Sequence, residues 1–141
     1  MERRDTILVV DDTADVADLL RGVLTGAGYR VLVAPTLDVG LTILAAFVVR
    51  LVLIDAPTPA DSDADAGKFW AELDRLAHAA GKTPLIVYAD ADPERYAAYG
   101  YAAHLAKPLD LDALVRTVAG LLPPARPDPT VAHGPAVALQ G

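Results

Sequence analysis

A repeated alternation of apolar runs and helical patterns is the sequence feature that most constrains the fold. Five short runs rich in Val, Ile, Leu or Ala are each followed by a segment whose apolar residues recur at helical spacing. The predicted strands are residues 6–10, 30–34, 50–55, 84–89 and 101–106. Parallel neighbours require crossover connections, and near-continuous apolar strands are covered on both faces. The pattern therefore predicts an α/β fold, with a five-stranded parallel sheet of order 2-1-3-4-5 and helices on both faces.

The helical segments carry recognisable start and stop signals. The predicted helices are residues 16–28, 37–47, 67–81, 92–100 and 109–122. Thr36 and Asp110 are the expected N-caps of the second and fifth helices, because their side-chain oxygens can accept hydrogen bonds from the first turn. The acidic run is expected to be a solvated loop, residues 60–67, over a candidate active site.

Composition limits the classes of protein that this sequence can belong to. The chain has 141 residues, of which 53% are hydrophobic and 22% are charged, which is typical of one compact domain. We expect this domain to span 1–122 and the proline-rich segment 123–141 to be a flexible tail or the start of a linker. The formal net charge of −7 argues against direct binding to nucleic acid or to anionic membranes.

The sequence also bears on compartment and covalent chemistry. It contains no cysteine, which excludes disulfides, thiolate metal sites and cysteine nucleophiles. No apolar run approaches the roughly 20 residues that cross a bilayer, so we expect a soluble, cytoplasmic protein.

Four charged side chains stand where predicted strands end. Asp11 and Asp12 follow the first strand, Asp55 ends the third and Lys107 follows the fifth. In open parallel sheets, ligands bind outside the carboxyl ends of the strands, so these groups are expected in one cleft. Crowded carboxylates repel unless a cation lies between them, and oxygen ligands suit Mg²⁺. Together with a fixed lysine, they predict a cleft for a phosphoryl group in which Asp55 is the nucleophile.

The same residues carry a resemblance to a known family. The motifs ILVVDD (7–12), LVLID (51–55) with Pro59 four positions later, and Lys107-Pro108 occur in the order and place typical of receiver domains of two-component response regulators. The sequence resembles these flavodoxin-like domains over residues 5–122. The resemblance implies a phosphoprotein that takes part in phosphorelay signalling and is not a turnover enzyme.

The resemblance also implies roles for individual residues. Asp55 would be the phosphoacceptor, forming an aspartyl phosphate, and Lys107 would contact the phosphoryl group. The donor would be a sensor histidine kinase or a phosphotransfer protein. The implied Mg²⁺ ligands are Asp11, Asp12, Asp55 and the backbone carbonyl of Pro57.

Two positions depart from the family pattern. Receivers usually carry Ser or Thr at the end of the fourth strand and an aromatic residue three positions before the lysine; counting from Pro84, these switch positions hold Ala89 and His104. Neighbouring Tyr88 is expected to point to the opposite face, because side chains alternate along a strand. These departures support an alternative hypothesis, a degenerate receiver that acts as a phosphorylation-independent interaction module.

A cluster of tyrosines lies near the fourth helix and the fifth strand. Tyr96, Tyr99 and Tyr101 either half-bury their rings with the hydroxyl in water or belong to a partner face. In receivers, the face formed by the fourth helix, the fifth strand and the fifth helix often binds partners or a second receiver. The resemblance therefore implies a partner surface here that can serve in a homodimer.

Other interpretations of the acidic residues are weaker. Asp11 and Asp12 alone would fit a helix cap, but Asp55 and Lys107 in matching places favour the metal site. The acids at 61–72 approach the spacing of a calcium loop, but the glycine stands at 67 rather than 66 and a strand precedes the run. A haloacid-dehalogenase-like phosphatase requires two acids separated by one residue, whereas Asp11 and Asp12 are adjacent.

Overall fold

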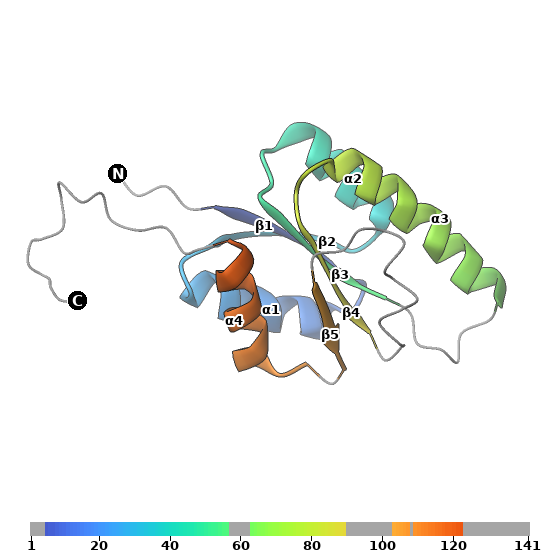
Figure 1. Ribbon diagram of the computed structural model, residues 1–141. Coiled ribbons are helices and arrows are strands. Elements are labelled where there is room, and N and C mark those ends of the chain that lie inside the picture. The colour runs from blue at the N-terminus through green and yellow to red at the C-terminus, as the bar shows by residue number, and fades with distance from the viewer. Residues whose placement is uncertain (1–4, 57–62, 90–102, 108, 123–141) are drawn as a thin grey trace, which may run out of the picture.

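Five parallel strands form the sheet in the computed structural model (Figure 1). The structure describes residues 5–56, 63–89, 103–107 and 109–122, and within these ranges the side chains of 63–70 and 104 are not described. The strands are β1 (Thr6–Val10), β2 (Arg30–Ala34), β3 (Leu51–Asp55), β4 (Leu85–Ala89) and β5 (Ala103–Ala106). Their order is β2-β1-β3-β4-β5, and every neighbouring pair is parallel. The predicted α/β fold and strand order are confirmed.

Helices cover both faces of this sheet (Figure 1). The described helices are α1 (Ala14–Gly26), α2 (Leu37–Ala46), α3 (Asp63–Ala80) and α4 (Leu111–Leu121). Buried residues of α1 and α4 pack on one face, and those of α2 and α3 pack on the other. The helix predicted at 92–100 and the tail predicted at 123–141 lie outside the described residues.

The three central strands, β1, β3 and β4, are buried on both faces because their side chains alternate between two apolar clusters. Leu8, Val52 and Val87 point toward α2 and α3. Their strand neighbours Ile7 and Leu53 point toward α1 and α4. A strand that is apolar on both faces has no polar face to mark the solvent side. Its sequence therefore does not show which of the two apolar clusters a given side chain packs in.

Local signals explain the starts of α2 and α4 and the turn after α1. The Thr36 hydroxyl accepts a hydrogen bond from the Val39 N–H at 3.2 Å, and Asp110 accepts from two N–H groups in the first turn of α4. Both predicted N-caps are confirmed. Gly28 adopts a φ of 103° between α1 and β2, a conformation that glycine reaches without the steric cost that other residues meet.

The start of α3 differs from the prediction. The helix begins at Asp63, so the prediction that residues 60–67 form a loop is wrong from residue 63 onward. Acidic side chains in a first turn interact favourably with the helix dipole, so this run is compatible with a helix start. No helix in the part of the chain that the structure describes has the length and hydropathy of a membrane span.

Candidate functional site

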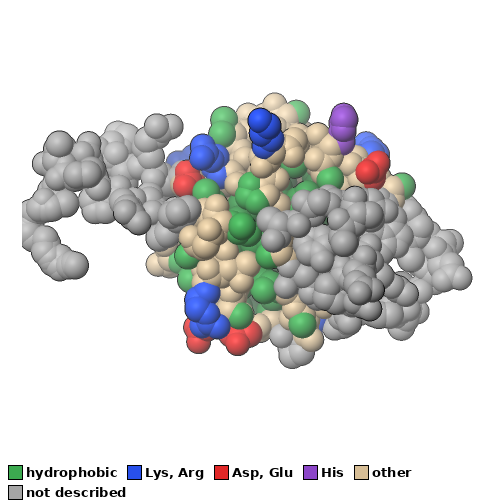
Figure 2. Space-filling view, in the orientation of Figure 1, with side chains coloured by type: hydrophobic (Ala, Val, Ile, Leu, Met, Phe, Trp, Pro, Cys, Tyr) green, Lys and Arg blue, Asp and Glu red, His purple; other side chains and the backbone are tan. Residues whose placement is uncertain are grey.

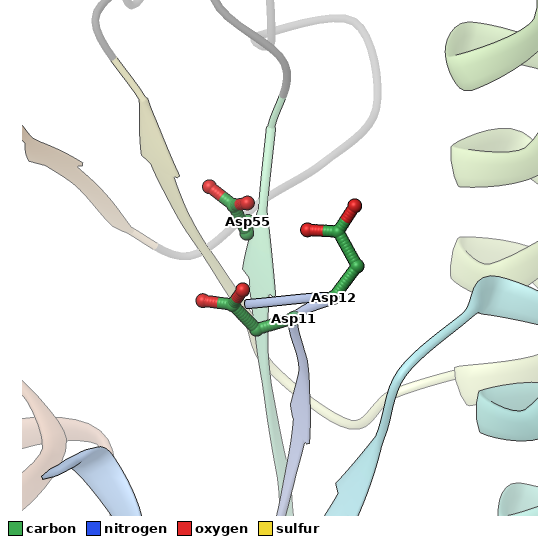
Figure 3. A group of neighbouring side chains, drawn as sticks. All are labelled: Asp11, Asp12 and Asp55. Carbon is green, nitrogen blue, oxygen red and sulfur yellow. The ribbon is translucent and has the colours of Figure 1, made fainter. Parts of the chain in front are cut away.

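The carboxyl ends of β1 and β3 bring three carboxylates together. β1 and β3 are neighbours, with Val10 opposite Ile54, so Asp11 and Asp12 come next to Asp55. One oxygen from each of the three lies within 4.8 Å of the others. Figure 3 shows the three carboxyl groups around a common space at the strand ends. The strand order thus produces the predicted acidic cluster.

Asp11 is the buried member of this cluster. Its side chain accepts two hydrogen bonds, from the Thr13 N–H at 2.8 Å to Oδ1 and from the Tyr88 hydroxyl to Oδ2. Only 4% of Asp11 is exposed. Thr13 is the N-cap residue of α1 but makes no side-chain capping bond. Asp11 accepts from the N–H of the N-cap residue itself and not from an N–H in the first turn of α1.

Asp55 forms an ion pair with Lys107, which follows β5. The Lys107 ammonium also donates to the Ala56 carbonyl at 3.1 Å, so the lysine is held across the ends of β3 and β5. Burial raises the pKa of Asp55; the hydrogen bond and charge of Lys107 lower it, whereas Asp11 and Asp12 raise it further. Because burial and repulsion outweigh the lysine, the carboxylate form of Asp55 is destabilised in this environment.

The donor set fits a hard divalent cation. All three side chains offer oxygen atoms, and Asp12 is exposed, which leaves a path from solvent. Asp55 Oδ1 is buried, and its partner among the described residues is the Lys107 ammonium. A cation at this point would offset the mutual repulsion of the carboxylates, and Mg²⁺, which keeps several waters, suits so few protein ligands.

Tyr88 is the site residue that sequence reasoning missed. Tyr88 and Ala89 do point to opposite faces, but the cleft lies on the Tyr88 side, and Ala89 is fully buried against the α2 and α3 cluster. The Tyr88 hydroxyl reaches Asp11, and the Lys107 ammonium lies 5.7 Å from the centre of its ring. Burial, the hydrogen bond to Asp11 and the nearby carboxylates raise the pKa of Tyr88 far above its usual value, so the phenol remains a donor.

Of the remaining predicted site residues, the structure describes only the backbone of His104. His104 lies in β5 opposite Val87, and its side chain is outside the described residues. The other four, Pro57, Tyr96, Tyr99 and Tyr101, also lie outside the described ranges.

A mostly apolar cavity of about 340 Å³ adjoins the charged cluster. Asp11, Asp55, Tyr88 and Lys107 line its polar end. Its apolar walls come from α1, from the segment before α4 and from the first residue of α4; they are Val16, Leu19, Leu20, Leu109 and Leu111. The charged groups therefore open onto a largely apolar surface.

Comparisons with known proteins agree with this architecture. No model of a protein family matches the sequence, and no curated protein matches it. Among solved structures, the chain is similar to the chemotaxis protein CheY4 of Vibrio cholerae, with a TM-score of 0.71 and 20% identity over 85% of this chain and 100% of that one. A CheY-like response regulator receiver domain protein from Methanospirillum hungatei matches with a TM-score of 0.69 and 22% identity, over 84% and 93% of the two chains.

A third similar structure is HP1043, an orphan response regulator of H. pylori. Its TM-score is 0.68 at 18% identity, over 85% of this chain and 99% of that one. At these identities the likeness concerns the fold. The protein has the CheY-like receiver fold over most of its length, and its structural neighbours are receiver domains of response regulators.

Proposed function

We propose that the protein is a signalling receiver that accepts a phosphoryl group on Asp55 in a Mg²⁺-dependent reaction. The donor would be the phosphohistidine of a sensor kinase or of a phosphotransfer protein. Phosphorylation would then change the binding of a partner protein. In this proposal the chain is a substrate of one transfer and not a turnover enzyme.

The proposed reaction follows from the groups around Asp55. A carboxylate oxygen of Asp55 forms the new O–P bond while the N–P bond of the donor breaks, and its electron pair returns to the imidazole. Lys107 would leave its ion pair with Asp55 and stabilise negative charge on the transferred oxygens. The ligands for the cation would be Asp11, Asp12 and Asp55, with the carbonyl of Pro57 expected from the resemblance. Bound there, Mg²⁺ would supply charge neutralisation.

One observation carries this proposal: three carboxylates and a lysine meet at the ends of neighbouring parallel strands. Each group alone has an ordinary explanation, as a cap, a loop acid or a surface lysine. Together they form a cluster whose repulsion favours a cation and whose lysine favours an anion. Few ligands other than a phosphoryl group with its metal meet both requirements.

The direct test uses a small phosphodonor. The protein is incubated with acetyl phosphate and Mg²⁺, and its intact mass is measured beside an Asp55→Asn variant and a sample with EDTA. We expect one phosphoryl adduct in the wild type and none in either control. Absence of an adduct from folded wild-type protein that binds Mg²⁺, both with this donor and with a cognate kinase, would contradict the proposal.

A second candidate function is an interaction module that does not require phosphorylation. The observation that favours it is the packing of β4, where Ala89 is fully buried away from the cleft and the tyrosine beside it is bonded to Asp11. Partner binding that is equal in wild type and in Asp55→Asn, with and without phosphodonor, would support this candidate over the first.

We further propose that residues 1–122 form the receiver and that 123–141 are a tail or linker. The support is at the end of α4, where Leu122 is buried and its carbonyl accepts a hydrogen bond from the Tyr29 hydroxyl. Limited proteolysis of the full chain is expected to yield a stable fragment that ends soon after residue 122. Early cuts within 5–56 would contradict this boundary.

We also propose a cytoplasmic location and a partner face built on β5 and α4. Apolar side chains reach the surface around α4 in the space-filling view (Figure 2), and Leu121 at its end is 36% exposed. The tyrosines at 96, 99 and 101 are expected to extend this face. Analytical ultracentrifugation with and without phosphodonor would detect a homodimer, and a Leu121→Asp variant should weaken it.

A further inference from the structure

We propose that Tyr88 is a positioning residue for the cation site, whose hydroxyl holds the Asp11 carboxylate among the other acids. The inference rests on the proposed Mg²⁺ site and adds a residue to it. Tyr88 does not itself need to touch the cation. Its contribution would be to keep a ligand of the cation in place before the cation arrives.

The position of Tyr88 is firmly defined by its surroundings. The residue is 1% exposed, lies opposite Asp55 in the β3–β4 pair, and packs in the cluster formed with α1 and α4. The Lys107 ammonium lies near its ring face, a favourable cation–π arrangement. The hydroxyl can therefore act as a fixed point, because the ring that carries it has little room to move.

Asp11 needs such a fixed point. It is buried beside two carboxylates, Asp12 and Asp55, and within the described part of the chain Lys107 contacts Asp55 rather than Asp11. Burial and like charges both favour turning an unheld carboxylate toward water. The hydrogen bonds from the Thr13 N–H and the Tyr88 hydroxyl oppose this, one on each oxygen.

These two hydrogen bonds leave Asp11 able to bind a cation. A carboxylate has about four lone-pair sites on its two oxygens, so each oxygen that accepts one hydrogen bond can still offer another site. Groups that hydrogen-bond to metal ligands fix their orientation, and their loss typically costs 10–100-fold in metal affinity. Tyr88 is in the position to do this for Asp11.

The chain contains a matched control for this proposal. Tyr29 is also 1% exposed and belongs to the same apolar cluster, but its hydroxyl donates to the Leu122 carbonyl at 2.6 Å. Tyr29→Phe therefore removes an equivalent buried phenol hydroxyl without changing the hydrogen bonds of any of the three acids. A general loosening of the core would affect both variants alike.

The test is Mg²⁺ binding measured by isothermal titration calorimetry on the full-length wild type, Tyr88→Phe and Tyr29→Phe. We expect Tyr88→Phe to bind Mg²⁺ about 10–100-fold more weakly and Tyr29→Phe to match the wild type. In an Asp11→Ala background, Tyr88→Phe should cause no further loss, because the group that Tyr88 positions is gone. If Tyr88→Phe does not fold, Tyr88→Met provides a second variant that lacks the hydroxyl but adapts to the core.

Three results would overturn the inference while leaving the proposed function intact. They are unchanged affinity in the Tyr88 variant, equal losses in both tyrosine variants, and tighter binding, which would show that the hydroxyl competes with the cation. Failure of the wild type itself to bind Mg²⁺ would overturn the inference together with the metal-dependent function. The wild-type titration therefore distinguishes the two failures.

Discussion

Tyr29 and Tyr88 are two buried tyrosines of one apolar cluster, and the difference between them lies in what their hydroxyls bind. Each is 1% exposed and donates one hydrogen bond. Tyr29 binds a backbone carbonyl of Leu122, just past the end of α4, whereas Tyr88 binds the carboxylate of Asp11. Burial alone therefore does not separate a structural tyrosine from one that belongs to a site. The charge and mobility of the acceptor separate them.

The acceptors respond differently when their donor is lost. The Leu122 carbonyl belongs to the backbone and its bond with Tyr29 is buried, so loss of the hydroxyl would leave this acceptor without its partner. The Asp11 carboxylate can rotate away from its like-charged neighbours. We infer that the Tyr29 hydroxyl mainly stabilises the fold. The Tyr88 hydroxyl instead keeps the Asp11 carboxylate close to the like-charged Asp12 and Asp55.

The largest predicted effect is one that the two residues share. Tyr29→Ala and Tyr88→Ala each remove a buried ring, and each should lower the free energy of unfolding by about 3–5 kcal/mol. Urea denaturation followed by circular dichroism would measure both. A decrease in the free energy of unfolding of less than about 1 kcal/mol for either variant would show that its ring is not tightly packed. The two tyrosines would then not be equivalent core residues.

A smaller effect should separate the two hydroxyls. Tyr29→Phe should lower the free energy of unfolding by about 1–3 kcal/mol, because a buried acceptor is left unsatisfied. Tyr88→Phe should cost less than about 1 kcal/mol without Mg²⁺, because Asp11 relaxes and its repulsion from Asp12 and Asp55 falls. The same urea titration measures both, and the reverse order would contradict the roles assigned here.

The smallest effect concerns the charge of Asp55. Its pKa is raised from 3.8 mainly by burial, so the folded state holds the proton more tightly than the unfolded state does. This contribution favours folding at low pH and is lost as the pH rises through the folded pKa. Asp55→Asn should therefore raise the melting temperature at pH 7 without Mg²⁺, and the gain should shrink as the pH falls toward 4.

A matched control for this charge effect is Asp38→Asn. Asp38 is exposed and pairs at 3.8 Å with Arg75, which is also exposed, so this substitution should change the melting temperature little at either pH. A wild type that is more stable than Asp55→Asn at pH 7 would show that the Lys107 ion pair outweighs the burial of Asp55. The ionised Asp55 carboxylate would then stabilise the fold, as the Tyr29 hydroxyl is expected to do.

The sequence was sufficient to predict the sheet and most of the cluster, because each depends on strong local signals. Five apolar runs with helical segments between them imply parallel pairing, and the acids after residues 10 and 54 must then lie at one edge. The N-caps at Thr36 and Asp110 follow from side-chain chemistry alone. These elements require no knowledge of tertiary contacts.

The role of Tyr88 was not predictable in the same way. The run PLIVYA is apolar throughout, so alternation showed that Tyr88 and Ala89 face opposite sides but not which side carries the cleft. A shift of one residue in this assignment exchanges the two faces. The signal that could have helped was the tyrosine itself, because a hydroxyl inside a buried strand needs a polar partner.

We propose Asp55 as the phosphoacceptor, and locating the phosphoryl group on the chain tests this assignment. The protein is treated with acetyl phosphate and Mg²⁺, reduced with borohydride to convert an acyl phosphate to a stable alcohol, and mapped by peptide mass spectrometry. We expect homoserine at position 55, at no other acid, and only when Mg²⁺ is present. Modification of Asp11 or Asp12 instead, or modification of Asp55 that is unaffected by EDTA, would contradict it.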